Sequence, residues 1–367
     1  MKSRIVLLVK IVVASGLLYY LLQSGKIDLG RLVDRLNDPR GWGWIALAQG
    51  LVFAMLFFAA IRWNLLLRAQ GIVYSFREVF SLGMIGFFFN QFVPGSTGGD
   101  LVKAYYVAVE HSELRAAGVT TVFLDRMIGL FVLIAMAGCA VLFNVEWIRA
   151  DAHLEFLALF ITCALLGFLF ASLLFFNETF RKLTWMRSLV RRWFFYDKIH
   201  KIQSALFVYR KHPGKVFAAV LLSVLVQSSV VLSCFCLFLA LGGGVVSLKS
   251  FFFLVPVALL VMAIPVSPPG GLGVGEWAFT ELFRKVGYVD GGLIALVQRA
   301  NWYLWALVGL LYFLRKKKRV SEALAKVRDV QKRGESSEAP VDEKLEEDVA
   351  WEASLRSEGR KHEFEQL

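Results

Sequence analysis

Long apolar stretches of 18 or more residues, separated by short charged or glycine-rich segments, dominate the sequence. An α-helix needs about 20 predominantly apolar residues to cross the ~30 Å hydrocarbon core of a bilayer. We therefore expect about six full transmembrane helices, at residues 5–22, 42–61, 119–144, 154–176, 216–241 and 292–314. The composition agrees, because 57% of the residues are hydrophobic and only 19% are charged, which excludes an ordinary soluble domain.

Two further apolar stretches are interrupted by clusters of prolines and glycines. Residues 90–100 read NQFVPGSTGGD and residues 265–276 read PVSPPGGLGVGE. Proline and glycine break helices, and irregular backbone persists in hydrocarbon only where protein or a wet cavity satisfies it. We therefore predict two re-entrant half-helix hairpins, at about 78–112 and 251–287. The predicted breaks are Pro94, Gly95, Gly98, Gly99, Pro265, Pro268, Gly270, Gly271 and Gly273.

The positive charge lies in the loops between the apolar stretches. The formal net charge is +12, of which residues 320–367 carry −5 and residues 1–319 carry +17. Membrane topology and anionic lipid headgroups explain this distribution better than nucleic-acid binding does. Ten basic residues mark 177–215 as a cytoplasmic loop, which either lies on anionic lipids or is an ordinary solvated connector. Arg62, Arg68 and Arg77 mark the cytoplasmic end of the second span.

Counting crossings between these loops gives the two hairpins opposite orientations and puts both termini in the cytoplasm. The first half, 1–148, and the second half, 149–319, then share the order span, span, hairpin, span, and residues 320–367 are a charged cytoplasmic tail. The predicted fold class is an all-α polytopic membrane protein built as an inverted repeat. In such repeats, paired broken segments point to a transport site near the midplane.

Candidate binding residues recur in both halves. Asp100 follows the first break and Glu276 the second, and an intramembrane arginine follows each, Arg126 after 26 residues and Arg299 after 23. A guanidinium at this depth needs a partner or a polar interior, and its fork geometry suits a phosphodiester. The helix N-termini at the breaks also favour anions. Structural ion pairs and N-terminal caps are the alternative roles of these charges.

Other polar residues near the breaks complete the candidate set. Asn90 and Gln91 are predicted to line the cavity or bond the broken backbone, and Lys103 to pair with Asp100 or reach a headgroup. Asp125, which points about 100° away from Arg126 on the helix, needs a partner elsewhere, and Ser267 is expected to satisfy backbone. The sequence predicts no metal site and no cofactor, since the histidines are scattered and the four cysteines lie inside apolar runs.

At these same residues the sequence resembles the lysylphosphatidylglycerol synthase transmembrane family of flippase-like membrane proteins. The resemblance rests on 90–100, on Leu124, Asp125, Arg126 and Gly129, and on 265–276, and it covers about residues 5–315. It implies a bacterial inner-membrane protein that moves an aminoacylated phospholipid or a related glycolipid between leaflets. Two-domain relatives carry an aminoacyl-transferase domain after the membrane part, and the tail of this chain is too short for one.

Three functions are therefore open. The first is a lipid translocase for an anionic or aminoacylated phospholipid or glycolipid, without an ATPase motif and so passive or gradient-driven. The second is a membrane-embedded glycosyl- or acyltransferase with a lipid carrier, which would make a donor-dependent product. The third is a non-catalytic membrane partner protein, which should lose function when residues 320–367 are deleted. The sequence leaves a homo-oligomer open.

Overall fold

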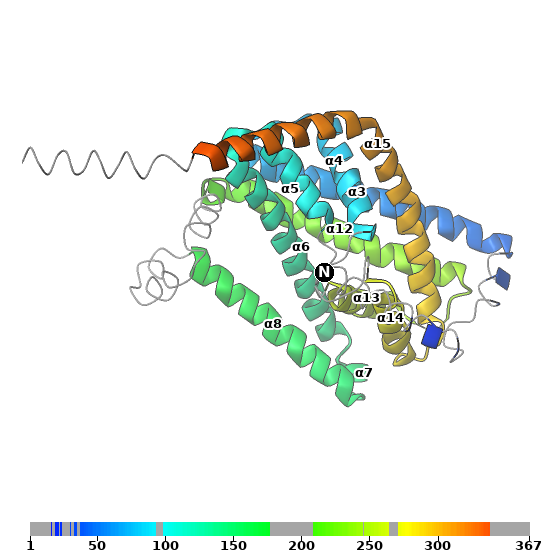
Figure 1. Ribbon diagram of the computed structural model, residues 1–367. Helices are drawn as coiled ribbons and strands as arrows, with labels where there is room; N and C mark the ends of the chain where they lie inside the picture. Colours follow the sequence, from blue (N-terminus) through cyan, green and yellow to red (C-terminus); the bar gives the residue numbers. More distant parts are fainter. Residues whose placement is uncertain are drawn as a thin grey trace, which may run out of the picture. The chain divides into compact units, whose positions relative to one another are not determined.

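The computed structural model describes residues 16, 19–21, 23, 30, 33–34, 37–92, 98–176, 208–244, 246–263 and 271–337. All regular elements of these residues are helical (Figure 1). They are η1 (Pro39–Gly41), α3 (Trp42–Ala69), α4 (Phe76–Phe92), α5 (Gly98–Glu110), η2 (Ser112–Leu114), α6 (Arg115–Phe143), α7 (Val145–Arg149), α8 (Ala152–Phe176), η3 (Val208–Lys211), α12 (Pro213–Ala240), α13 (Leu248–Met262), α14 (Val274–Arg284) and α15 (Gly291–Ser337). The chain is an all-α polytopic membrane protein.

Five of the described helical segments are long and apolar enough to cross a membrane. They are Pro39–Ala69, Arg115–Phe143, Ala152–Phe170, Pro213–Ala240 and Gly291–Lys316. They correspond to five of the six predicted spans. Most of the first predicted span, 5–22, lies outside the described residues, as do residues 177–207 of the basic loop and 338–367 of the tail.

Besides the five-residue α7, four of the described α-helices are too short to cross a bilayer alone. At about 1.5 Å per residue, α4 with 17 residues, α5 with 13, α13 with 15 and α14 with 11 reach roughly 16–26 Å, less than the ~30 Å of a hydrocarbon core. They form two pairs, α4 with α5 and α13 with α14, and the members of each pair contact each other. Each pair flanks one of the predicted breaks.

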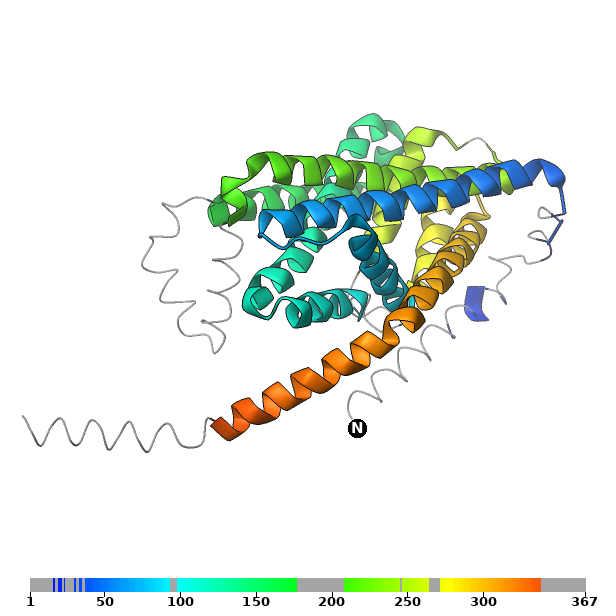
Figure 2. The same cartoon turned by 90° about the horizontal axis from the view of Figure 1, so that it is seen from above.

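The membrane part, residues 1–313, forms one compact unit and residues 314–367 form a second. Inside the first unit, the most extensive helix pair is α3 with α12, which lie side by side in Figure 2. They run antiparallel, since Arg62 bonds Ser223 near one end and Ser233 bonds the Ala48 carbonyl nearer the other.

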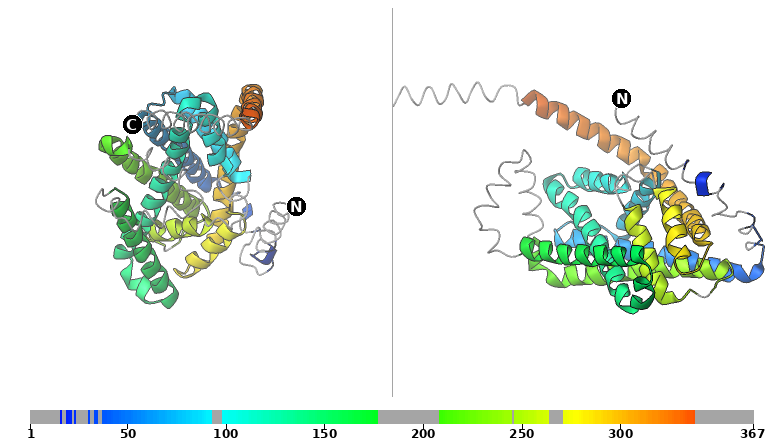
Figure 3. Two further views of the ribbon diagram at one scale, coloured as in Figure 1. Left: turned by 60° about the vertical axis from the view of Figure 1, so that its left-hand side comes forward. Right: turned by 90° about the horizontal axis from the view of Figure 1, so that it is seen from below.

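Three of the remaining helices, α4, α6 and α13, pack against the α3–α12 pair. α6 contacts α3, α5, α12 and α13, and α8 lies against α6 at one edge of the unit (Figure 3). On the other side, α15 approaches α4 so closely that a Cβ on Gly309 would lie 2.2 Å from the Met84 carbonyl oxygen.

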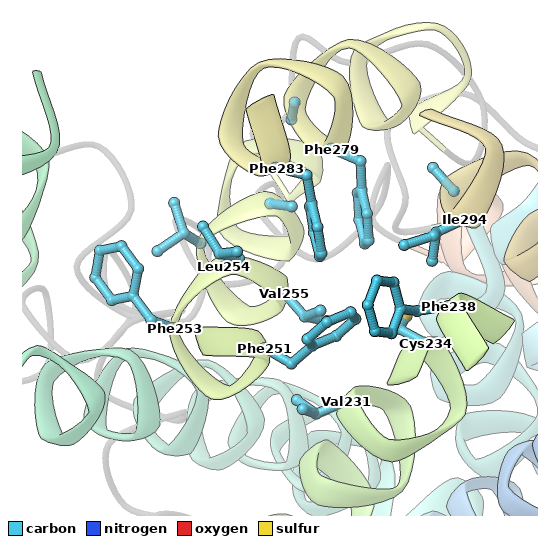
Figure 4. Packing of buried hydrophobic residues seen from close by; sticks show 14 of the residues in the cluster. Val231, Cys234, Phe238, Phe251, Phe253, Leu254, Val255, Phe279, Phe283 and Ile294 are labelled. Atoms are coloured by element: carbon cyan, nitrogen blue, oxygen red, sulfur yellow. The ribbon is translucent and has the colours of Figure 1, made fainter. Parts of the chain in front are cut away.

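Aromatic side chains fill the core of the second half. Phe238 from α12, Phe251 from α13 and Phe283 from α14 are buried, and their rings are in contact (Figure 4). Centroid separations of 5.2 Å and 4.9 Å are those of stabilising aromatic pairs. This packing fixes the positions of α13 and α14, the helices that flank the second break.

Candidate functional site

In the first half, an ion pair links α5, the helix that follows the predicted break, to the long helix α6. Asp100 lies in the first turn of α5, and Arg126 of α6 donates from Nε to its carboxylate. The Asp100 side chain is 13% exposed and the Arg126 side chain 48%. Nearly half of the Arg126 side chain is therefore left uncovered by the described residues.

The corner between α4 and α5 is built by two glycines and an amide. A Cβ on Gly99 would lie 1.7 Å from the carbonyl oxygen of Gly86, so only glycine allows the two backbones to meet here. Asn90 at the end of α4 accepts a 2.8 Å hydrogen bond from the Gly99 amide. This bond satisfies one open N–H at the start of α5 and leaves Asp100 facing α6.

Lys103 lies on the same helix as Asp100, one turn further along. Its ammonium is 4.9 Å from the centroid of the Trp63 ring, a cation–π contact. Asp100 and Asp125 are close enough to attract it, and Arg62 and Arg126 close enough to repel it. Its stem passes so near Gly86 that a Cβ there would lie 2.7 Å from its Cε. Lys103 therefore sits within a group of charges.

The sequence analysis did not identify Arg62 as a site residue, because it placed Arg62 at the end of the second span. The structure places Arg62 inside a helix. α3 continues to Ala69 instead of ending near residue 61, and Arg62 is 7% exposed inside it. Arg62 donates from Nε and Nη2 to Asp125 at 2.7 and 3.0 Å, and from Nη1 to Ser223 at 2.7 Å. The signal was available, because an apolar run of residues continues after Arg62.

In the second half, a fully buried ion pair stands at the corresponding place. Arg299 of α15 donates from Nε and Nη2 to Glu276 of α14 at 2.5 and 3.1 Å. The two side chains are 5% and 0% exposed. Geometry with two parallel N–H···O bonds is the strongest form of this pair.

The broken backbone before α14 closes around this pair. Gly273 donates its amide to Glu276 at 2.7 Å, and Gly271 accepts from Arg299 Nη2 at 3.1 Å. Both glycines have positive φ, 77° and 70°, which other residues adopt at a cost. A Cβ on Gly275 would lie 3.1 Å from Arg299 Nη2, so glycine also leaves room for the guanidinium.

Two polar contacts lie at the ends of the short helices. Tyr74 donates to Glu110 at 2.6 Å across the open end of α4–α5, and burial raises the pKa of the Tyr74 hydroxyl above its usual range. Lys285, after α14, donates to Asp151 before α8 at 2.5 Å. That hydrogen bond lowers the pKa of the Asp151 carboxyl below its usual range.

The other predicted residues are placed as follows. Gln91 is 8% exposed, and its Oε1 has no hydrogen-bond partner among the residues that the structure describes. Ser267 and the breaks Pro94, Gly95, Pro265, Pro268 and Gly270 lie outside the described residues. Among the described residues, no three histidine, cysteine or acidic side chains gather as a metal site. Of the four cysteines, Cys139 and Cys163 are exposed, and Cys234 and Cys236 are buried.

The site thus presents arginine and lysine cations, carboxylates that can release them, and helix N-termini. Such groups bind anions by charge and by directed N–H donors. The two halves differ in access, since the Arg126 pair is half open and the Arg299 pair is sealed.

Comparison with known proteins assigns the family. Residues 7–310 match the model of the lysylphosphatidylglycerol synthase TM region. The chain is also 26% identical, over 287 residues, to a UPF0104 membrane protein of Pyrococcus horikoshii, covering 72% of this chain and 84% of that protein. No solved structure matches. The match over nearly the whole membrane part shows that this chain belongs to the lysylphosphatidylglycerol synthase transmembrane-region family.

Proposed function

We propose that this protein is a lipid translocase that moves an anionic or aminoacylated phospholipid or glycolipid between the leaflets of its membrane. The proposal rests on an arrangement that occurs twice in the chain. In each copy, a short helix has an acidic residue in its first turn, and that residue pairs with an arginine on the next long helix. Asp100 with Arg126 is the first copy and Glu276 with Arg299 is the second. The family of the chain supports the same function.

Matched contacts in the two halves support an inverted repeat. If α3, α4, α5 and α6 correspond to α12, α13, α14 and α15, then α3–α12 joins equivalent helices. The contact of α6 with α13 corresponds to that of α15 with α4. The residue before each arginine also bonds the equivalent long helix, Asp125 to Arg62 of α3 and Gln298 to Ser233 of α12. We propose that the short pairs are oppositely oriented re-entrant hairpins, with both termini in the cytoplasm.

The charge balance of the first half favours an anionic headgroup. Among the described residues, the cations Arg62, Lys103 and Arg126 lie close to two carboxylates, Asp100 and Asp125. A lysine ammonium at this depth is stable only with a counter-charge or after losing its proton. A phosphate group would supply that counter-charge between Lys103 and Arg126.

The difference in access between the two arginines fits alternating access. Arg126 is half exposed while Arg299 is sealed against Glu276. In the proposed cycle, each acidic residue holds its arginine when the lipid is absent and releases it when the headgroup arrives. The structure then corresponds to the state in which the first-half site is open.

The test is translocation of a fluorescent phosphatidylglycerol in liposomes that contain the purified protein. We expect Arg126→Ala to slow translocation about 10-fold or more, since hydrogen bonds to a charged group contribute roughly 1.5–3 kcal/mol and 1.4 kcal/mol is a factor of ten. Arg284→Ala is the matched control, because Arg284 is 54% exposed and paired with Glu281 away from the site. Its rate should equal that of the wild type.

The proposal would be refuted if the wild-type protein translocated no lipid in the liposomes, or if the wild type and Arg126→Ala translocated lipid at equal rates. A new lipid product formed only with an added donor would favour the transferase alternative instead. The reaction mixtures are therefore analysed by mass spectrometry as well as by fluorescence.

A further inference from the structure

A small cavity lies beside the Arg299–Glu276 pair, bordered by α12, α13, α14 and α15. Its walls include Met262 of α13 and Gly275 of α14, and its polar lining includes Gln298, Arg299 and Trp302 of α15. Its empty volume is ≈ 260 Å³ including its open mouth, and ≈ 10 Å³ is available to the centres of water-sized spheres. That is about the room for one oxygen atom of the size of water.

Two buried N–H groups on this lining have no acceptor within the part of the chain that the structure describes. One is Nε2 of Gln298, a residue that is only 2% exposed. The other is Nε1 of Trp302, one turn further along α15. A buried donor without an acceptor is costly and calls for an explanation such as a position for a ligand atom.

The orientation of the Gln298 amide is set on its other side. Its Oε1 lies 2.8 Å from the Ser233 hydroxyl, which also lies 3.2 Å from the Ala48 carbonyl oxygen, and the Cys234 thiol donates to Oε1 at 3.8 Å. The thiol places the oxygen of the amide toward α12, and the amide nitrogen then lies on the other side.

The polar side chains of α15 that line the cavity carry N–H donors, and donors favour a ligand atom that is an acceptor. Gln298, Arg299 and Trp302 all offer N–H groups, while the nearby Glu276 carboxylate already accepts from Arg299 and Gly273. A water molecule has two hydrogens of its own that need acceptors. An oxygen of an oxyanion has none, so it fits a donor-only lining better than water does.

We propose that this cavity is a second headgroup subsite that receives one phosphoryl oxygen, with Gln298 and Trp302 as its donors. The assignment of the ligand rests on the proposed function, which supplies an anionic lipid, and it adds two residues that the repeated arginine–carboxylate pattern does not contain. Gln298 corresponds to Asp125 of the first half, and Asp125 is held in an ion pair by Arg62. The second half therefore offers donors at the position where the first half has a saturated ion pair.

The experiment measures the indole N–H resonances of the full chain, labelled with ¹⁵N-tryptophan and held in a phosphate-free maltoside detergent. The Trp302 resonance is identified by its loss in Trp302→Phe. Phosphatidylglycerol, inorganic phosphate and a diacylglycerol with the same acyl chains are titrated separately. Trp305→Phe is the matched control, because Trp305 lies one turn away and its Nε1 already donates to Gln49 at 2.9 Å.

We expect phosphatidylglycerol to move the Trp302 resonance and diacylglycerol to leave it in place. Binding, read from the ligand-dependent rise in Tm, should weaken about 10-fold in Trp302→Phe and stay unchanged in Trp305→Phe. Gln298→Glu, which replaces a donor by a negative acceptor, should weaken phosphatidylglycerol binding at least as much and does not depend on Trp302→Phe being folded.

Movement with the lipid alone assigns the site to a lipid headgroup, and movement with inorganic phosphate as well assigns it to the phosphate group from either source. No movement with either phosphate compound, or equal movement with diacylglycerol, would overturn the subsite and leave an ordinary buried water there. If the resonance responds but the wild type translocates no lipid, the proposed function fails and the subsite stands.

Discussion

The sealed pair in the second half makes the strongest prediction about stability. Glu276→Ala removes the carboxylate that holds Arg299, whose side chain is only 5% exposed. It also removes the acceptor of the Gly273 amide at the start of α14. The equivalent change in the first half, Asp100→Ala, leaves Arg126 with 48% of its side chain exposed and able to find other partners.

The two variants should differ clearly in size. Breaking a buried ion pair by removing one partner costs about 3–5 kcal/mol, whereas a pair with a largely exposed partner contributes about 0–1 kcal/mol. At roughly 2 °C per kcal/mol for a large chain, Tm should fall by about 6–10 °C in Glu276→Ala and by less than about 2 °C in Asp100→Ala.

The measurement is thermal unfolding in detergent, followed by the accessibility of the buried cysteines Cys234 and Cys236 to a thiol-reactive dye. The double variant Glu276→Leu/Arg299→Met tests the cause, because removing both charges takes away the buried uncompensated one. Its Tm should return most of the way to that of the wild type.

Equal losses in Glu276→Ala and Asp100→Ala would refute the difference in burial on which the reasoning depends. A double variant as unstable as Glu276→Ala would refute the electrostatic cause and point to packing or capping.

Two further predictions concern the ends of the half-helix pairs. Gly99→Ala should lower Tm strongly, because its Cβ would lie 1.7 Å from the Gly86 carbonyl oxygen. The control is Gly83→Ala in the same helix pair, whose Cβ meets nothing within 4 Å and which should leave Tm unchanged. Equal Tm values for the two variants would contradict the close approach of α4 and α5. The Asp151 carboxyl has a lowered pKa because Lys285 donates to it, so its stabilising contribution is present above the unfolded pKa of about 4 and is lost as pH falls through the lower folded value. Tm measured from pH 6 to pH 3 should therefore fall less in Lys285→Gln than in the wild type, and parallel curves would show that this pair does not stabilise the fold.

Much of the candidate site could be read from local sequence. The breaks at 90–100 and 265–276, the acid after each and the intramembrane arginines are visible as departures from an apolar background. Proline and glycine act on the backbone of their own segment, and an ionisable residue in an apolar run is costly wherever it finally packs. These features need no knowledge of distant neighbours.

The pairing of the charges could not be read in this way. Arg62 looked like the end of a span because loops rich in arginine are the usual sign of a cytoplasmic boundary. Its partners are 63 and 161 positions away, Asp125 on α6 and Ser223 on α12. Only the antiparallel packing of α3 against α12, with α6 beside them, brings these side chains together.

By itself, the sequence determined the class of the protein, the positions of its long helices and the places where helices break, because hydrophobicity and backbone preference act locally. The tertiary structure decided which carboxylate holds which arginine, that one pair is half exposed and the other buried, and that Gln298 and Trp302, each with an unsatisfied donor among the described residues, line one cavity. Burial and hydrogen-bond satisfaction depend on what the neighbouring helices place around each group, and no periodicity along one helix contains that information.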